Sequence, residues 1–149
     1  MKIIITGSLG HISKPLTKIL LEKGHNITVI SRDADKQAAI EDMGAVAAIG
    51  SLQDVSFLSN VFAGADAVYT MVPPISSMDT KLEPIGHFST LGKIYTTAIE
   101  QADVRRVVNL SSWGAHRDED YYKNRPVLGK IKISSFAKDF VLAYQKQVS

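Results

Sequence analysis

The chain reads Thr6-Gly7-Ser8-Leu9-Gly10-His11-Ile12-Ser13 between its first apolar run and its first helical segment. The run before it, residues 2–5, is apolar at nearly every position, which is typical of a strand buried on both faces. After the turn, Pro15 stands where the first turn of a helix tolerates proline, and residues 16–20 carry an apolar stripe. The start of the chain therefore predicts a strand, a glycine-containing turn and a helix.

The same alternation of short β-branched runs and longer helical segments continues along the chain. Further strands are expected over residues 26–30, 45–49, 67–72 and 104–110. Helical crossovers between such strands require parallel pairing, and their right-handed sense places helices on both faces of the sheet. The prediction is an α/β fold with a doubly wound parallel sheet of the Rossmann kind and strand order 3-2-1-4-5.

The composition favours a single soluble domain. Of the 149 residues, 45% are hydrophobic and 21% are charged, so the chain can bury a core of its own. A net charge of only +2, with both signs interleaved, gives no basic surface for nucleic acid or an anionic membrane. No apolar run is long enough to span a membrane, and the absence of cysteine excludes disulfides and thiolate metal sites. We expect one cytoplasmic domain over residues 1–149, with no metal site.

Small residues in the turn indicate a binding site for a dinucleotide. Gly7 allows a sharp turn, and Gly10 allows the backbone to approach a pyrophosphate with no Cβ in the way. Free N–H groups at the start of the helix, aided by the helix dipole, would then face the negative ligand. Ser13 stands where a third glycine would be expected; it is small enough for close helix–strand packing, and its hydroxyl could cap the helix or contact a phosphate. Two glycines alone also fit a purely structural turn, and only their place in a strand–turn–helix unit favours a cofactor.

The end of the second strand, Ser31-Arg32-Asp33, bears on the choice of cofactor. An acidic residue at this place binds the ribose 2′-hydroxyl of NAD, whereas a cation accommodates the 2′-phosphate of NADP. Arg32 offers a planar fork suited to phosphate, and Ser31 could donate one more hydrogen bond. Asp33 either binds ribose or caps the following helix, and Arg32 also fits a solvated loop. The pattern favours NADP(H) over NAD(H).

Two further strand ends are expected to border the same site. Residues 51–54 follow the third strand and would lie near the adenine, although Asp54 as a helix cap explains this segment equally well. Val72-Pro73-Pro74 follows the fourth strand, where the nicotinamide end of the cofactor crosses the sheet. The two prolines either form a stiff wall there or only end the strand.

Together these segments resemble the atypical short-chain dehydrogenase/reductases, in particular their NmrA-like branch. That branch includes NADPH-dependent quinone oxidoreductases and cofactor-sensing regulators. The resemblance runs from Met1 to about His116. The segments that carry it are Thr6-Gly7-x-x-Gly10, Ser31-Arg32, Gly64-Ala65-Asp66-Ala67-Val68 and Arg105-Arg106-Val107-Val108-Asn109-Leu110-Ser111-Ser112.

The resemblance implies a role for each matching residue. The residues that would line the pyrophosphate are Gly7, Leu9, Gly10, His11 and Ile12. Arg32 would meet the 2′-phosphate. The residues that would border the nicotinamide ribose are Met71, Val72 and Pro73. Ser111 and Ser112 fall where short-chain dehydrogenases place a catalytic serine beside the substrate carbonyl, although small hydroxyl residues also commonly end a strand.

One motif of the classical family is absent. That family carries Tyr-x-x-x-Lys, in which the lysine lowers the pKa of the tyrosine so that it donates a proton to the carbonyl. Here Tyr121 is followed at that spacing by Arg125, and Tyr122 by Pro126. This argues against classical alcohol dehydrogenation. It leaves quinone reduction open, because quinone oxygens need little protein acid once hydride arrives. His116 is either a substitute proton donor or a solvated loop residue.

Beyond the fifth strand the chain departs from the family. Members normally continue with a sixth strand and a small substrate-binding lobe. Here residues 127–129 resemble the start of the helix that follows strand five, and residues 131–140 resemble the family's closing helix. We interpret residues 113–149 as a shortened C-terminal segment with an internal deletion near residues 129–131. Without the lobe the nicotinamide end would face solvent, and the edge of strand five would favour a homodimer or be covered by residues 127–133.

Two functions from different classes remain open. The first is an NADP(H)-dependent oxidoreductase that transfers hydride to a small electron-poor substrate such as a quinone. The second is a non-catalytic regulator of the NmrA type that senses NAD(P); the missing tyrosine–lysine pair and the shortened C-terminal segment favour it. Both require a nicotinamide cofactor at the turn from Gly7 to Ser13.

Overall fold

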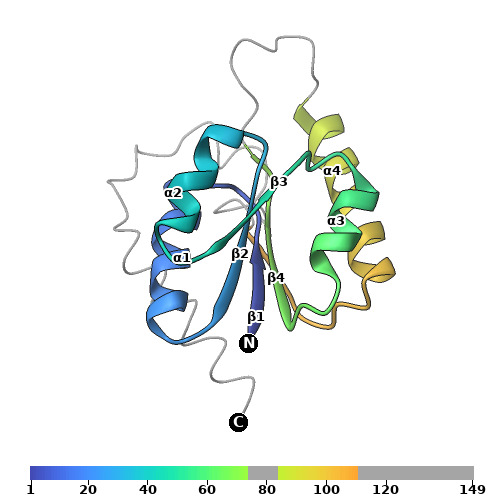
Figure 1. Cartoon of the computed structure of the whole chain (residues 1–149). Helices are drawn as coiled ribbons and strands as arrows, with labels where there is room; N and C mark the ends of the chain where they lie inside the picture. Colours follow the sequence, from blue (N-terminus) through green and yellow to red (C-terminus); the bar gives the residue numbers. More distant parts are fainter. Residues whose placement is uncertain (74–83, 111–149) are drawn as a thin grey trace, which may run out of the picture. The chain divides into compact units, whose positions relative to one another are not determined.

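The computed structural model describes residues 1–73 and 84–110, and these contain a parallel sheet of five strands with helices on both faces (Figure 1). The elements in chain order are β1 (Lys2–Ile5), α1 (Ser13–Glu22), β2 (Asn26–Ser31), a 3-10 helix (Ala34–Lys36), α2 (Gln37–Glu41), β3 (Val46–Ile49), α3 (Val55–Phe62), β4 (Ala67–Met71), α4 (Pro84–Gln101) and β5 (Val107–Leu110). The strand order is β3-β2-β1-β4-β5, which confirms the predicted doubly wound sheet.

β1 lies at the centre of the sheet, and the winding of the chain reverses there. β1 pairs in parallel with β2 on one side, Ile4 opposite Thr28, and with β4 on the other, Ile4 opposite Val68. In open sheets of this kind, ligands bind beyond the carboxyl ends of the strands at such a reversal point. The loops that follow β1 and β4 are therefore the place to look for a site.

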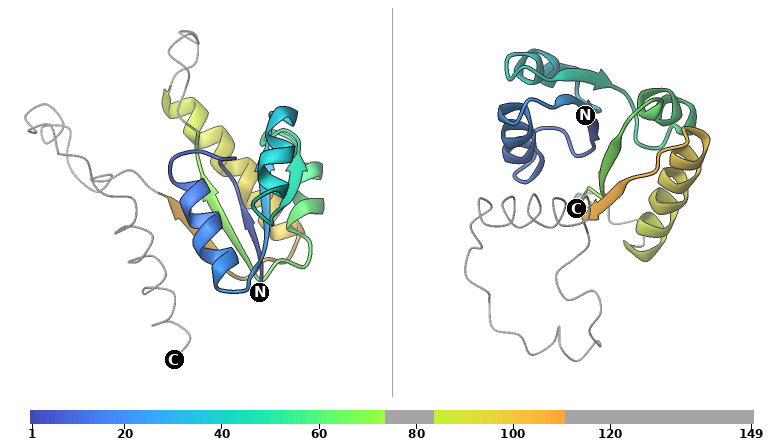
Figure 2. Two further views of the ribbon diagram at one scale, coloured as in Figure 1. Left: turned by 60° about the vertical axis from the view of Figure 1, so that its left-hand side comes forward. Right: turned by 90° about the horizontal axis from the view of Figure 1, so that it is seen from below.

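Helices α1 and α2 cover one face of the sheet and α3 and α4 the other, as the views in Figures 1 and 2 both show. Under α3 and α4 lies an apolar core in which Ile4, Leu58, Phe62 and Val68 are fully buried. Burying one such side chain stabilises the fold by about 1.5–3 kcal/mol. This core gives the carboxyl edge of the sheet a rigid base.

Helix boundaries follow the chemistry that the sequence indicated. Asp33 Oδ1 accepts a hydrogen bond from the N–H of Asp35 at 3.0 Å, and Asp54 Oδ1 accepts one from the N–H of Phe57 at 3.0 Å. Gly24, at a φ of +78°, follows the end of α1 and donates its N–H to the Leu21 carbonyl. Both aspartates therefore cap helical segments, which was one of the alternatives open for Asp33.

The predicted start of the fifth strand is wrong. The apolar run from residue 104 predicted a strand over residues 104–110, whereas β5 begins at Val107. Val104 instead turns inward: its N–H donates to the Ile99 carbonyl at the end of α4, and its side chain joins the core. The apolar character of Val104 therefore reflects the packing of a helix end, which a run of β-branched residues does not distinguish from a strand.

Several predictions fall on residues outside the described ranges. They concern Ser111, Ser112, the motif positions near residues 121–126, the deletion near residues 129–131 and the shortened segment 113–149. The homodimer and the covering of the β5 edge stay predictions for the same reason. Within residues 1–73 and 84–110, no helix combines the length and hydrophobicity needed to cross a membrane.

Candidate functional site

The turn after β1 brings backbone groups to the carboxyl edge of the sheet. Gly7 has a φ of +96° and Ser8 a φ of +53°, so the chain reverses through the left-handed region. The N–H of Ser8 donates to the Ile30 carbonyl at 3.1 Å, and the N–H of Gly10 donates to the Gly7 carbonyl at 3.2 Å. The turn is thereby fastened to β2 and to itself.

Gly7 is needed for space as well as for its dihedral angle. A Cβ built at Gly7 would overlap Met71 Sδ and would lie 2.6 Å from Ser13 Oγ. Met71 ends β4 and Ser13 begins α1, so the absence of a side chain at Gly7 lets β1, β4 and α1 meet at one point. Any larger residue would require the side chains of Met71 and Ser13 to move.

Thr6, immediately before the turn, is fully buried and is hydrogen-bonded to residues of both β4 and α1. Its N–H donates to the Tyr69 carbonyl at 3.0 Å, and its Oγ1 accepts from the N–H of Met71 at 2.9 Å. Its carbonyl accepts from the Ser13 hydroxyl at 3.0 Å. The expectation that this hydroxyl caps α1 or contacts a phosphate is wrong, because Ser13 is fully buried and its proton is used inside the protein.

The N-terminus of α1 presents backbone N–H groups without protein acceptors. No side chain caps the helix at Ile12, and the first helical N–H to be bonded is that of Lys14, which donates to the Gly10 carbonyl. Over residues 9–13, the N–H groups of Leu9, His11, Ile12 and Ser13 have no acceptor among the described residues; His11 and Ile12 lie at the surface of the turn, whereas Ser13 is fully buried. Such groups, together with the positive end of the helix dipole, attract an anion.

A cleft of about 400 Å³ opens over this turn. It is lined by Gly7, Ser8, Gly10, His11 and Ile12 from the turn, Ile30, Ser31 and Arg32 from the end of β2, Leu52 after β3, and Met71 and Pro73 at the end of β4. This volume is typical of a small-molecule site. The structure thus brings together eight of the ten residues predicted to bind the cofactor; Leu9 and Val72 do not line the cleft, and Val72 packs against the core instead.

The end of β2 gives its three residues different roles. The Ser31 hydroxyl accepts from the Ser8 hydroxyl at 2.9 Å and from the Asp33 N–H at 3.1 Å, and it donates to the Asp33 carbonyl at 3.2 Å. Its hydrogen-bonding capacity is therefore filled by the protein. The Asp33 carboxylate caps the 3-10 helix. Arg32 is exposed, and its guanidinium makes no hydrogen bond or ion pair with the described residues.

Three residues line the cleft that were absent from the predicted set: Ser8, Ile30 and Leu52. Leu52 belongs to the segment expected near the adenine, and Ile30 is the last apolar residue of its strand. Ser8 was the hardest to find from the sequence, because its role depends on a hydroxyl pair with Ser31 that is 23 residues away. The sequence signal for the pair is a serine between the two glycines of the turn, together with a second strand that ends in Ser31.

A family model described as NAD(P)H-binding matches residues 7–144 of the chain. This chain belongs to the NAD(P)H-binding family. The match confirms the expected kind of family, and it includes the glycine turn, the end of β2 and the end of β4. The cleft described above therefore lies in the region that defines a family of nicotinamide-nucleotide-binding proteins.

Similar proteins are longer than this NAD(P)H-binding family member. Sterol demethylase protein B of Methylococcus capsulatus is 27% identical over 116 residues, which cover 77% of this chain and 35% of that protein. The chain spans about a third of the length of that relative. About two thirds of that relative therefore has no counterpart in the alignment.

Solved structures share the fold at lower identity. Triphenylmethane reductase of Citrobacter superposes with a TM-score of 0.66 at 19% identity, covering 78% of this chain and 39% of that one. The NADPH-dependent quinone oxidoreductase of Escherichia coli, in complex with NADPH, superposes with a TM-score of 0.64 at 18% identity, covering 77% and 38%. At these identities the likeness establishes a common fold.

Replacing Gly7 with alanine is expected to destabilise the protein more than the same change at Gly24. Both glycines have positive φ values, so both variants bear the cost of a left-handed alanine, roughly 1–2 kcal/mol. At Gly24 nothing lies within 4 Å of an added Cβ, whereas at Gly7 the Cβ overlaps Met71. Urea unfolding should give a lower midpoint for Gly7→Ala than for Gly24→Ala. Equal midpoints would contradict the close contact of β1, β4 and α1.

Proposed function

We propose that this chain binds NADP(H) in the cleft over the glycine turn. We further propose that it is the cofactor-binding part of a reductase that transfers hydride to a small electron-poor acceptor such as a quinone. The observation that carries the proposal is the set of N–H groups between Leu9 and Ser13 that have no acceptor among the described residues, beneath a cleft at the reversal point of the sheet. Membership of the NAD(P)H-binding family supports the nicotinamide cofactor.

The residues of the turn fit a diphosphate. Gly10 is exposed, and with no Cβ there a ligand can approach the backbone closely. The N–H groups of the turn supply hydrogen-bond donors, and the adjacent helix end supplies a partial positive charge. His11 and Ile12 line the cleft beside these donors. An anionic linker with several acceptor oxygens satisfies more of these groups than a neutral ligand does.

The end of β2 supports NADP(H) over NAD(H). Asp33, whose carboxylate could accept from a ribose 2′-hydroxyl as an NAD site requires, is not among the residues that line the cleft, and its Oδ1 caps the 3-10 helix. Arg32 lines the cleft, is exposed and has no acidic partner among the described residues. A guanidinium in that position can donate two parallel hydrogen bonds to a 2′-phosphate. We therefore assign the phosphate contact to Arg32.

The end of β4 fits the nicotinamide half. Met71 and Pro73 line the cleft on the far side of the turn from Arg32, because β4 and β2 flank β1 on opposite sides. Their apolar surfaces suit a planar ring and keep water from one face of it. Ser111 and Ser112, which we propose to lie beside the acceptor, fall outside the described residues.

The chemistry is supplied by the cofactor. When bound, NADPH provides a hydride, which with one proton from solvent converts a quinone to its hydroquinone and leaves NADP⁺. Of the cleft-lining residues named above, only His11 and Arg32 carry titratable side chains. This suits an acceptor that requires little proton donation, so the chain would contribute position more than acid–base catalysis. The E. coli relative of the same fold is a quinone oxidoreductase, which supports the choice of acceptor.

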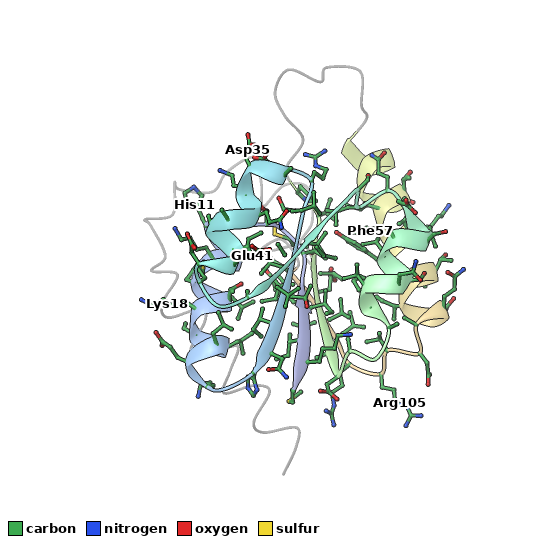
Figure 3. All side chains as sticks on the ribbon, viewed as in Figure 1. His11, Lys18, Asp35, Glu41, Phe57 and Arg105 are labelled. Atoms are coloured by element: carbon green, nitrogen blue, oxygen red, sulfur yellow. The ribbon has the colours of Figure 1, made fainter. Side chains whose placement is uncertain are left out.

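The assignment of Arg32 predicts a loss of cofactor discrimination. Arg32→Ala is expected to weaken NADPH binding about tenfold, since a charged hydrogen-bond donor to phosphate is removed, and to leave NADH binding unchanged. Arg105→Ala is the matched control, because it removes the same charge from a side chain that is 87% exposed. Arg105 lies on the opposite side of the ribbon from His11, which lines the cleft (Figure 3). Calorimetric titration of both nucleotides measures the effect. An Arg32→Ala variant that keeps the preference for NADPH would show the assignment to be wrong.

The reductase proposal predicts oxidation of bound NADPH by simple quinones. Stopped-flow absorbance at the reduced nicotinamide band should show oxidation faster than in a protein-free mixture of NADPH and quinone. The Gly7→Ala variant should lose this acceleration together with NADPH binding. Tight NADPH binding with no acceleration by any quinone tested would contradict the reductase and favour the regulatory alternative.

A further inference from the structure

A closed set of hydrogen bonds lies directly beneath the β4 side of the cleft. The hydroxyl of Tyr95, on α4, donates to the carbonyl of Met71 at 2.9 Å. The N–H of Met71 donates to Thr6 Oγ1 at 2.9 Å, and the Thr6 side chain is also hydrogen-bonded to the Tyr95 hydroxyl. Both peptide groups of Met71 are therefore held by side chains. Thr6 is fully buried, and Tyr95 is 5% exposed.

These bonds fix the segment that lines one end of the cleft. Met71 is the last residue of β4, and beyond it the chain is held by the packing of Val72 against the core. Met71 and Pro73 line the cleft on either side of Val72. Because only Val72 separates Met71 from Pro73, the position of the Met71 carbonyl determines where the side chains of Met71 and Pro73 lie.

The hydroxyl of Tyr95 is not needed for the apolar packing of α4. Tyr95 lies in the same core cluster as Leu91 and Ala98, where a phenylalanine would fill the same space. Burial raises the pKa of Tyr95, and the hydrogen bond from Thr6 opposes part of that rise. The phenol therefore remains protonated at neutral pH and remains a donor to the Met71 carbonyl.

We propose that Tyr95 is a positioning residue for the nicotinamide ring: through the Met71 carbonyl it holds Met71 and Pro73 in place as one wall of the cleft. This inference rests on the proposed function, since it concerns the same cofactor. It extends the site to α4, from which no described residue lines the cleft. Removal of the Tyr95 hydroxyl is therefore expected to alter the β4 end of the cleft and to leave the Arg32 end unchanged.

The test compares two ligands that differ in the nicotinamide ring alone. NADPH and 2′-phospho-ADP-ribose share the diphosphate and the 2′-phosphate, but the second lacks the ring. Tyr95→Phe should weaken NADPH binding about fivefold, the effect of one buried hydrogen bond, and should leave 2′-phospho-ADP-ribose binding unchanged. Thr6→Val, which removes the other side chain that holds Met71, should show the same difference between the two ligands.

Ser59→Ala is the matched control. The Ser59 hydroxyl lies 2.7 Å from both the Val55 carbonyl and Gln101 Oε1, so this variant also removes a hydroxyl that contacts α4, at the last residue of the helix rather than beside the cleft. It should bind both ligands as the unmodified chain does. Equal losses of both ligands in Tyr95→Phe would show a general structural role and overturn the proposal, and so would no loss of either.

The failure of the proposed function itself is distinguishable from these outcomes. If the unmodified chain bound neither ligand, the cofactor site would be refuted before any variant was compared. If the unmodified chain bound both ligands and Tyr95→Phe lost neither, only the role of Tyr95 would be overturned.

Discussion

The missing side chain at Gly7 is the constraint on which the site depends. It lets the sulfur of Met71 and the hydroxyl of Ser13 approach the backbone of the turn, so that β1, β4 and α1 meet without a gap. The hydrogen bonds of Thr6 then hold the three elements together. With the side chains packed beneath the turn, the N–H groups above it are left for a ligand. Tight packing on one side of the backbone thus produces the binding surface on the other.

The cleft divides into two ends with different physical character. On the β2 side, the hydroxyl of Ser31 is hydrogen-bonded within the protein and Asp33 does not line the cleft, whereas Arg32 lines it and its guanidinium has no partner among the described residues. On the β4 side the lining is apolar, and the polar groups that order it lie underneath. The first end suits a phosphate and the second a planar ring. The glycine turn between them suits the diphosphate that joins these two parts of a dinucleotide.

Much of the fold could be predicted because its causes are local. Apolar strand runs, helices with apolar stripes and the crossover rule between parallel strands indicate a doubly wound sheet, and the glycine turn after the first strand indicates its order. The caps at Asp33 and Asp54 also depend only on neighbours in sequence. Val104 was misassigned because packing against a helix end and pairing in a strand select the same residue type. The partners of Ser13 and Tyr95 were out of reach, since Thr6 and Met71 are brought to them only by the tertiary fold.

The most direct test of the account follows the backbone N–H groups of the turn themselves. A two-dimensional ¹H–¹⁵N spectrum of the labelled chain, recorded during titration with NADPH, reports on each amide separately. The largest shifts are expected at His11 and Ile12, which line the cleft and whose N–H groups have no acceptor among the described residues. Saturable shifts elsewhere with none at these two residues, or no shifts at all, would contradict the account.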